Sequence, residues 1–451
     1  MKSAIILAAG KGTRMVSNKN KVMHEILGKP MIEHVIDNLN RCGIETKIIV
    51  IGHDAESIKQ HFQDRVLFAY QKEQLGTAHA VMQADAAKGL TGSTLLMYGD
   101  IPLVQPETIE ALFEHNQKFD LTVATAILDD PLQYGRIVKD KEGKFEKIVE
   151  YKDADDQQKN IREINTGIYC VNNELLFKYI DHITNDNAQK EYYLTDLVEI
   201  FNNNGHKVGT YVVEDVVEVM GINDRIQLYE AGEWLKMRIN HHWMRNGVTM
   251  IDPASVYIDP DVEIGMDTIL YPNVHLQKST KIKQGCTILP GSFIINSEIG
   301  EYTTIDASRI VDSKVERNCK VGPYAHLRNG TIVHDKSRIG NFVEIKNSEI
   351  GENGRCAHLT YVGDATVGKD VNFGCGVVTV NYDGKHKYRT VIEEGAFIGS
   401  NVNLIAPVTV GRNAVVAAGT TVNKDVPEGD MAIGRSRQEN KPGYGQKYKN
   451  R

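Results

Sequence analysis

Short repeats fill the second half of the chain and restrict its fold more than any other sequence feature. From about residue 251 an aliphatic side chain recurs every six residues, and glycine directly follows many of them, as at 264–265 and 339–340. One inward aliphatic per repeat builds short strands joined by turns, and three repeats make one triangular coil of a parallel β-helix. The repeating aliphatics are Ile258, Ile264, Leu270, Leu276, Ile282, Ile288 and Ile294, then Val321, Leu327, Val333, Ile339 and Ile345.

The repeat is interrupted in three places. Its phase slips near Glu298 and Ile350, and it is lost across "NYDGKHKYRT", residues 381–390. Loops inserted into a solenoid commonly form its binding face. The sequence therefore predicts that residues 381–390 leave the coil as a loop with a binding role.

The first half alternates helical and strand patterns. Ile32, Val35, Ile36 and Leu39 have helical spacing, whereas 47–52 is an apolar strand pattern, 54–62 a helix and 93–100 another strand. This alternation predicts a mostly parallel sheet covered by helices. A longer helix is predicted from about residue 225 to Asn246-Gly247, with one apolar stripe made of Leu228, Ala231, Leu235, Ile239 and Trp243.

Composition indicates a globular chain of more than one domain. The 451 residues are 41% hydrophobic and 25% charged, and the formal net charge of −7 argues against a general nucleic-acid binder. No apolar run approaches the roughly 18 residues that span a bilayer, and no signal-peptide pattern is present, so we expect a cytoplasmic protein without membrane insertion. The six cysteines form no CxxC pair, which favours reduced thiols.

A glycine-rich cationic loop, "LAAGKGTRMVSNKNK" at residues 7–21, directly follows an apolar strand pattern. Ligands of open α/β sheets collect at the carboxyl ends of strands, and successive backbone N–H groups in a glycine turn form a nest for anions. Arg14 offers a planar fork and Lys21 a point charge to phosphate oxygens. The loop alone leaves two interpretations open, a phosphate cradle and a solvated basic turn.

Two oxygen-bearing side chains stand at the ends of other predicted strands. Asp100 lies in "YGDIPL" and Asn223 in "GIND". Magnesium in phosphate sites keeps waters and substrate oxygens beside one or two protein ligands. The pair is therefore a candidate magnesium site, with helix caps or turn residues as the alternative.

His358 departs from the aliphatic pattern of the repeats. It lies in "CAHLTYVGDA", and the ordinary pKa of histidine, near 6.5, suits a general base. Arg328, Lys346, Tyr361 and Lys387 lie one or two coils away and offer cations and a hydroxyl to a phosphorylated sugar. Because a bare scaffold needs none of these groups, the constellation predicts an active site.

Several motifs together carry a resemblance over nearly the whole chain: "LAAGKGTRM" with Lys21 beyond it, "QLGTAHA", "YGDIPL", "EINTGIY", "GIND" and the hexapeptide half. They resemble the bifunctional N-acetylglucosamine-1-phosphate uridyltransferase/glucosamine-1-phosphate N-acetyltransferase family. The resemblance implies a Rossmann-like nucleotidyltransferase domain at 1–224, a linker helix at 225–250 and a left-handed β-helix acetyltransferase domain with a C-terminal tail at 251–451. It further implies a homotrimer that makes UDP-N-acetylglucosamine for cell-wall precursors.

In the first half the resemblance implies transfer of UMP from UTP to N-acetylglucosamine-1-phosphate, with release of pyrophosphate and Mg²⁺ as cofactor. Arg14 and Lys21 are the implied catalytic cations, and Asp100 and Asn223 the implied metal ligands. The implied substrate contacts are Leu7, Ala8, Ala9, Gly10 and Lys21 at the UTP phosphates, Gln71, Gly76 and Thr77 at the uracil, Gly135, Glu150 and Asn165 at the sugar, and Asn223.

In the second half the resemblance implies acetylation of glucosamine-1-phosphate by acetyl-CoA, with His358 as the base. A supporting role for Glu344, in positioning the amine or the base, is a further hypothesis. The implied sugar-phosphate contacts are Arg328, Lys346, Tyr361, Asn372 and Lys387, and the implied acetyl-CoA contacts are Cys375, Asn381, Tyr382, Ser400, Ala418 and Arg435.

The chain departs from the family pattern at four positions. Asn20 replaces the proline before the lysine, so we expect a looser loop and weaker UTP binding. His326 and Asn329 replace arginine and proline near Arg328, which removes one cation from the phosphate site. Cys375 replaces alanine beside the acetyl-CoA site, and we expect its alkylation to slow acetyl transfer.

Two further interpretations remain beside the bifunctional enzyme. One is a sugar-1-phosphate nucleotidyltransferase whose β-helix only trimerises or binds a regulator. The other is a non-catalytic solenoid binding module. The opening loop with Asp100 and Asn223 disfavours the module, and His358 with its cationic neighbours disfavours the inert β-helix.

Overall fold

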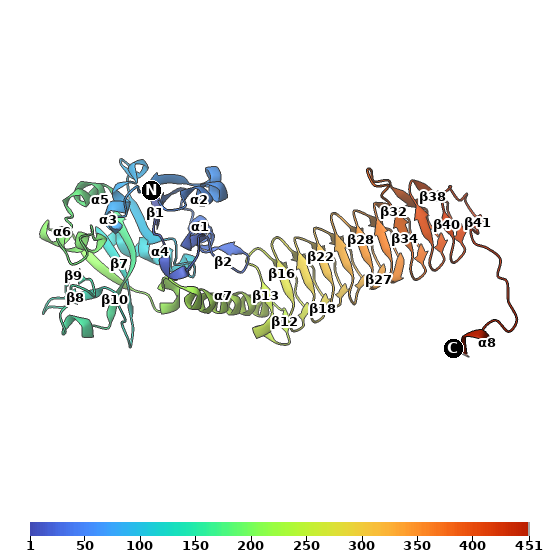
Figure 1. The fold of residues 1–451 in the computed structure, drawn as a ribbon. Coiled ribbons are helices and arrows are strands. Elements are labelled where there is room, and N and C mark those ends of the chain that lie inside the picture. Colours follow the sequence, from blue (N-terminus) through green and yellow to red (C-terminus); the bar gives the residue numbers. More distant parts are fainter. Residues whose placement is uncertain (450–451) are drawn as a thin grey trace. The chain divides into compact units, whose positions relative to one another are not determined.

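The computed structural model describes residues 1–449, and the chain divides into two compact units between Leu235 and Lys236. The first unit is built on a nine-stranded sheet with the order β11-β7-β10-β6-β1-β4-β5, extended by β8 and β9 beside β10 (Figure 1). Its strands are β1 (Lys2–Ala8), β4 (Thr46–Ile51), β5 (Leu67–Tyr70), β6 (Ser93–Tyr98), β7 (Leu121–Ile127), β8 (Arg136–Lys139), β9 (Phe145–Val149), β10 (Glu163–Asn172) and β11 (Val208–Val212).

Helices cover this sheet, as the alternating pattern predicts. The predicted helices at 32–39 and 54–62 are α1 and α2, and the predicted strands are β4 and β6. The α-helices of the first unit are α1 (Met31–Arg41), α2 (Ala55–Phe62), α3 (Thr77–Met82), α4 (Pro106–His115), α5 (Asn173–Tyr179) and α6 (Leu197–Asn203), and a short hairpin is formed by β2 (Glu25–Ile26) and β3 (Lys29–Pro30).

The sheet is mixed rather than purely parallel. β1 pairs in parallel with β4 and β6, whereas β10 runs antiparallel to both β6 and β7. Strands β8 and β9 pair antiparallel, and β10 returns beside β8 through a single register pair, Ile164 with Arg136. This excursion brings together Gly135 before β8, Glu150 after β9 and Asn165 within β10.

The predicted long helix is α7 (Arg225–Arg245), which ends directly before Asn246 and Gly247. Its apolar stripe is partly buried: Ala231 and Leu235 are in the core, and Ile239 and Trp243 pack against the aliphatic core of the second unit. Gly247 has φ +87°, a left-handed conformation that favours glycine directly after a helix.

The second unit is the parallel β-helix that the repeats predict, with three sheets of 11, 10 and 9 strands that the successive coils supply in turn. The first sheet contains β12 (Thr249–Met250), β15 (Ile269–Leu270), β18 (Thr287–Ile288), β21 (Thr304–Ile305), β24 (Lys320–Val321), β27 (Arg338–Asn341), β30 (Arg355–His358), β33 (Asn372–Phe373), β36 (Phe397–Ile398), β39 (Val415–Val416) and β41 (Met431–Ala432).

The second sheet contains β13 (Tyr257–Ile258), β16 (His275–Gln277), β19 (Phe293–Ile295), β22 (Arg309–Val311), β25 (His326–Arg328), β28 (Glu344–Lys346), β31 (Tyr361–Gly363), β34 (Val378–Val380), β37 (Asn403–Ile405) and β40 (Thr421–Val422). The third contains β14 (Glu263–Ile264), β17 (Lys281–Ile282), β20 (Glu298–Ile299), β23 (Lys314–Val315), β26 (Ile332–Val333), β29 (Glu349–Ile350), β32 (Ala365–Val367), β35 (Thr390–Ile392) and β38 (Val408–Val410). A short helix, α8 (Gln446–Lys449), lies near the end of the described chain.

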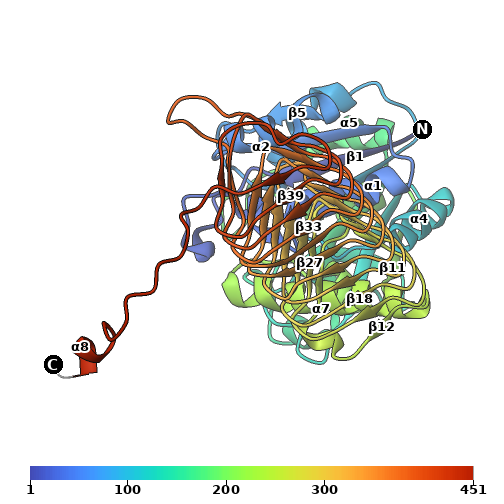
Figure 2. The ribbon, with the colours of Figure 1, turned by 90° about the vertical axis from the view of Figure 1, so that its right-hand side faces the viewer.

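The predicted aliphatics form one continuous core inside the coils. Glycine follows them because neighbouring coils approach closely: a Cβ at Gly340 would lie 1.9 Å from the carbonyl oxygen of Ala357 in the next coil. Between β34 and β35 the chain leaves the stack at 381–389, and this projecting loop is visible in orange both from the side and along the stack (Figures 1 and 2). The loop predicted from the broken repeat is confirmed.

All six cysteines are free thiols, five of them buried and Cys375 half-buried. Within residues 1–449 no helix combines the length and the apolar composition needed to cross a membrane.

Candidate active sites

The first unit contains a cavity of about 790 Å³ at the carboxyl ends of β1 and β6. Every residue that the sequence assigns to the nucleotidyltransferase site lines it, although these residues come from segments throughout the unit. They are Leu7, Ala8, Ala9, Gly10, Arg14, Lys21, Gln71, Gly76, Thr77, Asp100, Gly135, Glu150, Asn165 and Asn223. The fold thus gathers the separate motifs into one space.

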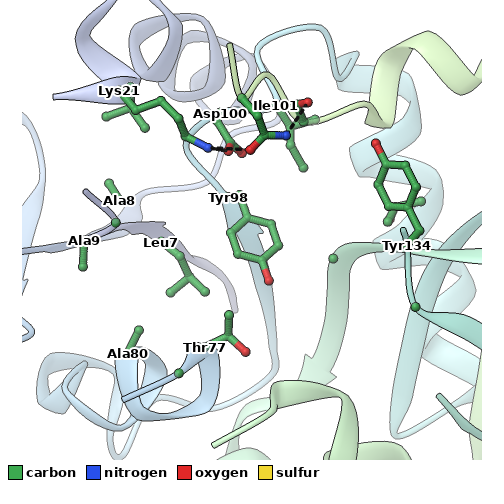
Figure 3. Close-up of a pocket in the computed structure, with 18 of the residues that line it drawn as sticks. Leu7, Ala8, Ala9, Lys21, Thr77, Ala80, Tyr98, Asp100, Ile101 and Tyr134 are labelled. Atoms are coloured by element: carbon green, nitrogen blue, oxygen red, sulfur yellow. Dashed lines mark hydrogen bonds and ion pairs between the residues drawn. The ribbon is translucent and has the colours of Figure 1, made fainter. Parts of the chain in front are cut away.

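The cationic loop forms one wall of this cavity. Strand β1 is buried from Ser3 to Ala8, and the chain then turns through Gly12, which has φ +57°. A Cβ at Gly12 would lie 2.5 Å from the Cβ of Lys21. Glycine therefore allows the loop to pack directly on the stem of Lys21, which points toward Asp100 (Figure 3).

Lys21, Asp100, Asn223 and Arg14 form one cluster. The Lys21 ammonium forms an ion pair with Asp100 and lies 3.1 Å from the Asn223 amide oxygen, Oδ1. Arg14 donates to the same amide oxygen at 2.9 Å. A carboxylate and an amide oxygen therefore face one cation at a single point. This oxygen-donor pair fits Mg²⁺, which prefers oxygen ligands and completes its shell with waters and phosphates.

Asn20 fastens the loop instead of loosening it. The side chain is buried, its Oδ1 accepts from the N–H of Val22 at 3.1 Å, and its Nδ2 donates to the carbonyl of His53 at 2.7 Å. Its own N–H donates to Asp54 at 3.3 Å. These three bonds hold Asn20 and its loop in place, whereas weaker UTP binding at this position stays a prediction.

The residues assigned to the uracil lie at the start of α3. Gln71 is buried, and its Nε2 donates to the carbonyl of Gly76 at 3.1 Å and lies 3.1 Å from Nδ1 of His79. Gly76 has φ +119°, and a Cβ there would lie 2.5 Å from the carbonyl oxygen of Tyr192. The amide of Gln71 is thus fixed at the cavity wall, with hydrogen-bonding groups of the kind that distinguish one base from another.

The residues assigned to the sugar lie across the cavity. Asn165, on β10, accepts from the N–H of Gly167 at 3.0 Å. Burial, followed by the charges of Asp153, Asp196 and Glu191, raises the pKa of the Glu150 carboxyl. A carboxyl group in such a dry position binds sugar hydroxyls or an amide through strong hydrogen bonds.

The sequence analysis did not identify several residues that line the same cavity. Tyr98 ends β6 directly before Gly99-Asp100, and its ring stands between Lys21 and Tyr134 in the close-up (Figure 3). Tyr98 could have been found, since it belongs to the "YGDIPL" motif. Glu191 and Gln227 carry no comparable signal, because only the folded chain brings them to the cavity.

In the second unit three of the sugar-phosphate residues lie on consecutive strands of one sheet. Arg328 on β25 pairs in register with Lys346 on β28, and Glu344 pairs with Tyr361 on β31. The Arg328 guanidinium donates to Glu344 at 2.6 and 2.9 Å. The adjacent Lys387 ammonium, and then partial burial, lower the pKa of Lys346. Two neighbouring ammonium groups suit an anion, and we call Lys346 and Lys387 the candidate anion site.

His358 is the last residue of β30, which belongs to the first sheet, whereas β25, β28 and β31 belong to the second. Its Nδ1 lies 2.9 Å from the amide oxygen of Asn341, which holds the register position beside it in the preceding coil. Since an amide oxygen accepts, this contact favours the tautomer with the proton on Nδ1 and the lone pair on Nε2. Asn341 was not identified from the sequence, although it lies in the "GNFVEIK" segment that contains Glu344. Asn372, on β33, belongs to the same sheet as His358.

The residues that the sequence assigns to acetyl-CoA continue along the coils. Asn401, next to Ser400, donates its N–H to the carbonyl of Cys375 at 2.7 Å, and Gly419, next to Ala418, donates to the carbonyl of Ser400 at 2.8 Å. Arg435 donates to the carbonyl of Ala418 at 2.9 Å. Cys375, Ser400, Ala418 and Arg435 therefore form one row, while Asn381 and Tyr382 open the projecting loop.

Comparisons with known proteins cover both units. Residues 4–159 match the family described as MobA-like NTP transferase domain, and 312–347 and 389–424 match Bacterial transferase hexapeptide (six repeats). Three relatives bear the name Bifunctional protein GlmU. Those from Exiguobacterium sibiricum and Geobacillus thermodenitrificans are each 51% identical over 444 residues, covering 98% of this chain and 99% and 97% of the relatives. The one from Halalkalibacterium halodurans is 47% identical over 450 residues, 99% of both chains. This chain belongs to the bifunctional GlmU family.

Membership of the GlmU family confirms the resemblance inferred from the motifs and the fold class that it implies. His326, on β25, faces Arg309 and Glu344 in register, and burial lowers its pKa. A largely neutral imidazole thus stands at the position where the resemblance implies an arginine.

Proposed function

We propose that the protein carries out two consecutive transfers, acetylation of glucosamine-1-phosphate on the β-helix and then transfer of UMP to the product in the first unit. Both activities belong to the bifunctional enzymes of UDP-N-acetylglucosamine synthesis, the family of this chain. The observation that carries the first-unit assignment is the single cavity lined by every predicted residue. We assign 1–224 to UMP transfer, 225–250 to a linker helix and 251–451 to acetyl transfer.

In UMP transfer the phosphate oxygen of N-acetylglucosamine-1-phosphate attacks the α-phosphorus of UTP in line. The bond from that phosphorus to the β-phosphate breaks, and pyrophosphate leaves with the electron pair. Arg14 and Lys21 offset the charge on the phosphates, and the nest of Leu7 to Gly10 aligns them. Asp100 and Asn223 would hold Mg²⁺, which when bound neutralises phosphate charge. Glu150, Asn165 and the Gly135 backbone orient the sugar, and Gln71 with Gly76 and Thr77 selects the base.

In acetyl transfer Nε2 of His358 takes a proton from the amine of glucosamine-1-phosphate as its nitrogen attacks the thioester carbonyl. A C–N bond forms, the C–S bond breaks, and the CoA thiolate leaves and is protonated. Asn341 fixes the tautomer of His358 that leaves Nε2 free to accept. Arg328, Lys346, Tyr361, Asn372 and Lys387 bind the sugar phosphate, and the row from Cys375 to Arg435 binds acetyl-CoA with Asn381 and Tyr382.

A homotrimer is part of this proposal. Tyr324, Phe342 and Leu359 occupy equivalent turns of successive coils, and all three side chains are more than half exposed. The Tyr324 and Phe342 rings stack at 5.5 Å, and Leu359 directly follows His358. We call these three residues the apolar column. A second copy of the chain packed on it would bury the column and enclose His358. Because UTP and acetyl-CoA are cytoplasmic metabolites, we place the enzyme in the cytoplasm.

The experiment that tests both assignments compares the intact chain with His358→Ala. Consumption of acetyl-CoA with glucosamine-1-phosphate is measured beside pyrophosphate release from UTP and N-acetylglucosamine-1-phosphate. We expect the variant to lose acetyl transfer and keep UMP transfer. If the intact chain consumes no acetyl-CoA, the β-helix is a scaffold and the single-activity interpretation holds.

A further inference from the structure

The second sheet of the β-helix carries a recurring aspartate at the turn that follows a strand. Asp312 follows β22 and Asp364 follows β31, with φ of 47° and 50°. Each donates its N–H to a carbonyl one coil back, Ile295 at 3.1 Å and Lys346 at 3.0 Å. Short polar side chains tolerate this left-handed conformation. The turn is therefore a structural device that the coils repeat.

Each aspartate also accepts from an asparagine of the preceding coil. The Asn296 amide lies 2.7 Å from Asp312, and the Asn347 amide lies 2.5 Å from Asp364. The environments differ, since Asp312 is exposed and Asp364 is buried at 7% exposure. The asparagine contact is common to both aspartates, so the additional burial of Asp364 comes from the projecting loop at 381–389.

Asp364 holds both ends of the loop at 381–389. Its Oδ2 accepts from the side-chain amide of Asn381, the first residue of the loop. Its backbone carbonyl accepts from the N–H of Thr390, the first residue after the loop, at 3.1 Å. Within the loop, the N–H of Tyr388 donates to the carbonyl of Asn381 at 2.9 Å. One residue thus closes the base of the loop.

Asp364 also faces the cations of the candidate anion site. Burial alone raises the pKa of its carboxyl, but hydrogen bonds from Asn347 and Asn381 and the charges of Lys346 and Lys387 lower it below its ordinary value. The carboxylate is therefore ionised at neutral pH. It offsets the repulsion between Lys346 on β28 and Lys387 on the loop, so the two lysines stay close together.

We infer that Asp364 is a positioning residue for acetyl transfer, which fixes the loop so that Asn381 and Tyr382 meet acetyl-CoA and Lys387 meets the sugar phosphate. The inference rests on the proposed acetyltransferase function. Asp364 acts through other residues: its carboxylate accepts hydrogen bonds from Asn347 and Asn381, and its carbonyl accepts one from Thr390.

The experiment uses Asp364→Asn, which keeps a side chain suited to the left-handed turn and removes the charge. We expect kcat/KM for acetyl-CoA and for glucosamine-1-phosphate to fall about tenfold, mainly through KM, as for the loss of one hydrogen bond to a charged group. UMP transfer by the same chain should be unchanged, and the thermal unfolding temperature should shift by less than about 2 °C. Trypsin should cut the exposed loop at Lys385, Lys387 or Arg389 several times faster.

Two matched variants separate the loop from the coil. Asp312→Asn changes the same turn three coils earlier, and Asn347→Gly removes only the coil side of the Asp364 contact at φ +47°. Both should leave loop cleavage and acetyl transfer close to those of the intact chain. The inference is overturned if Asp364→Asn keeps wild-type kinetics and cleavage, or if either matched variant reproduces its effects. If the intact chain transfers no acetyl group, the proposed function fails, while the cleavage comparison still decides whether Asp364 holds the loop.

Discussion

The ammonium of Lys21 forms an ion pair with the carboxylate of Asp100, 79 positions away in the sequence, and both side chains are largely buried, at 16% and 14% exposure. The Asn223 amide oxygen faces the same ammonium. A metal ion held by Asp100 and Asn223 would therefore compete with Lys21 for these oxygens, and the displaced ammonium would be free to meet phosphate oxygens.

This arrangement predicts the effect of Asp100→Asn on UMP transfer. We expect the Mg²⁺ concentration for half-maximal rate to rise at least tenfold and kcat/KM to fall about 10²–10³-fold, as for other electrostatic groups at a reacting phosphate. Acetyl transfer by the same chain should not change. Asp85→Asn, which alters an exposed acid paired with Lys88 outside the cavity, is the control. An unchanged Mg²⁺ dependence in Asp100→Asn would exclude Asp100 as a ligand.

Arg136 supports the sugar end of the cavity from behind. Its side chain is 1% exposed, and its guanidinium donates to the carbonyls of Pro131, Leu132, Tyr134 and Lys159. The loop held in this way carries Leu132, Gln133, Tyr134 and Gly135, all of which line the cavity. Arg136 thus fixes the backbone next to Gly135, which we assign to the sugar.

Arg136→Met should raise KM for N-acetylglucosamine-1-phosphate about tenfold and KM for UTP less than twofold. It should also lower the free energy of unfolding of the first unit by on the order of 3 kcal/mol, because buried carbonyls lose a charged donor. Steady-state kinetics and denaturant unfolding measure both effects. Arg162→Met, which removes an exposed arginine paired with Asp129, is the matched control. Equal increases in both KM values would indicate general unfolding instead of a local role.

The apolar column predicts how acetyl transfer depends on assembly. Phe342→Asp places a charge on the column at a left-handed turn that aspartate tolerates, and we expect it to dissociate the trimer and abolish acetyl transfer. UMP transfer should stay within twofold of wild type. Light scattering and the two assays measure these outcomes. Tyr302→Asp is the control, because Tyr302 is equally exposed but lies in the turn between β20 and β21, on another corner. A trimeric Phe342→Asp variant would show that the column is not the interface.

His334 links three coils of the β-helix through carboxylates. Its Nδ1 lies 3.0 Å from Glu316 and its Nε2 2.6 Å from Glu349. Burial alone lowers the pKa of His334, but hydrogen bonds to Glu349 and Glu316 raise it above its ordinary value. The raised pKa means that the folded state binds the proton more tightly than the unfolded state. The resulting stability is fully present below about pH 6 and is lost as the pH rises through the folded-state pKa.

The difference in unfolding temperature between the intact chain and His334→Gln should therefore be larger at pH 5.5 than at pH 8.5, by about 1–3 °C for a partly exposed pair. The Glu316 carboxylate, whose pKa its partners lower, stays ionised over this range. His326→Gln is the control with the opposite sign. Burial lowers the pKa of His326, so the stability that its neutral form contributes is lost as the pH falls. If the difference in unfolding temperature between the intact chain and His334→Gln is the same at both pH values, the prediction is wrong.

The parts of this structure that the sequence predicts are those in which periodicity reports burial directly. Ile339 and the other repeating aliphatics face the core because each coil needs one inward side chain, so the β-helix follows from spacing alone. The helix α1 follows from its apolar stripe in the same way. The nucleotide cavity follows from strand ends, since parallel strands bring their carboxyl ends to one edge.

The rest depends on partners that are distant in sequence. Asn20 fastens its loop through His53, 33 positions away, and no local pattern shows that contact. Glu191 reaches the cavity from a loop without a motif, and Asn341 is set beside His358 only by the register of stacked coils. Strand β10 runs antiparallel to β7 because the β8–β9 excursion returns the chain to the end at which β7 left the sheet, where Glu163 pairs with Ile127. These contacts form only when the chain packs into its tertiary structure, so no periodic pattern in the sequence predicts them.

Cys375 offers a chemical test of the acetyl-CoA row. Burial is the main factor that raises the pKa of the other five thiols, to about 11 or 12, whereas Cys375 is half-buried. Because the thiolate is the reactive form, iodoacetamide at pH 7.5 should modify Cys375 first. A carboxamidomethyl group there would stand in the row with Ser400 and Ala418 and should obstruct acetyl-CoA. We expect alkylation to slow acetyl transfer at least tenfold and spare UMP transfer, with protection in Cys375→Ala. If Cys375→Ala is equally sensitive, another thiol is responsible and the row does not bind acetyl-CoA at this point.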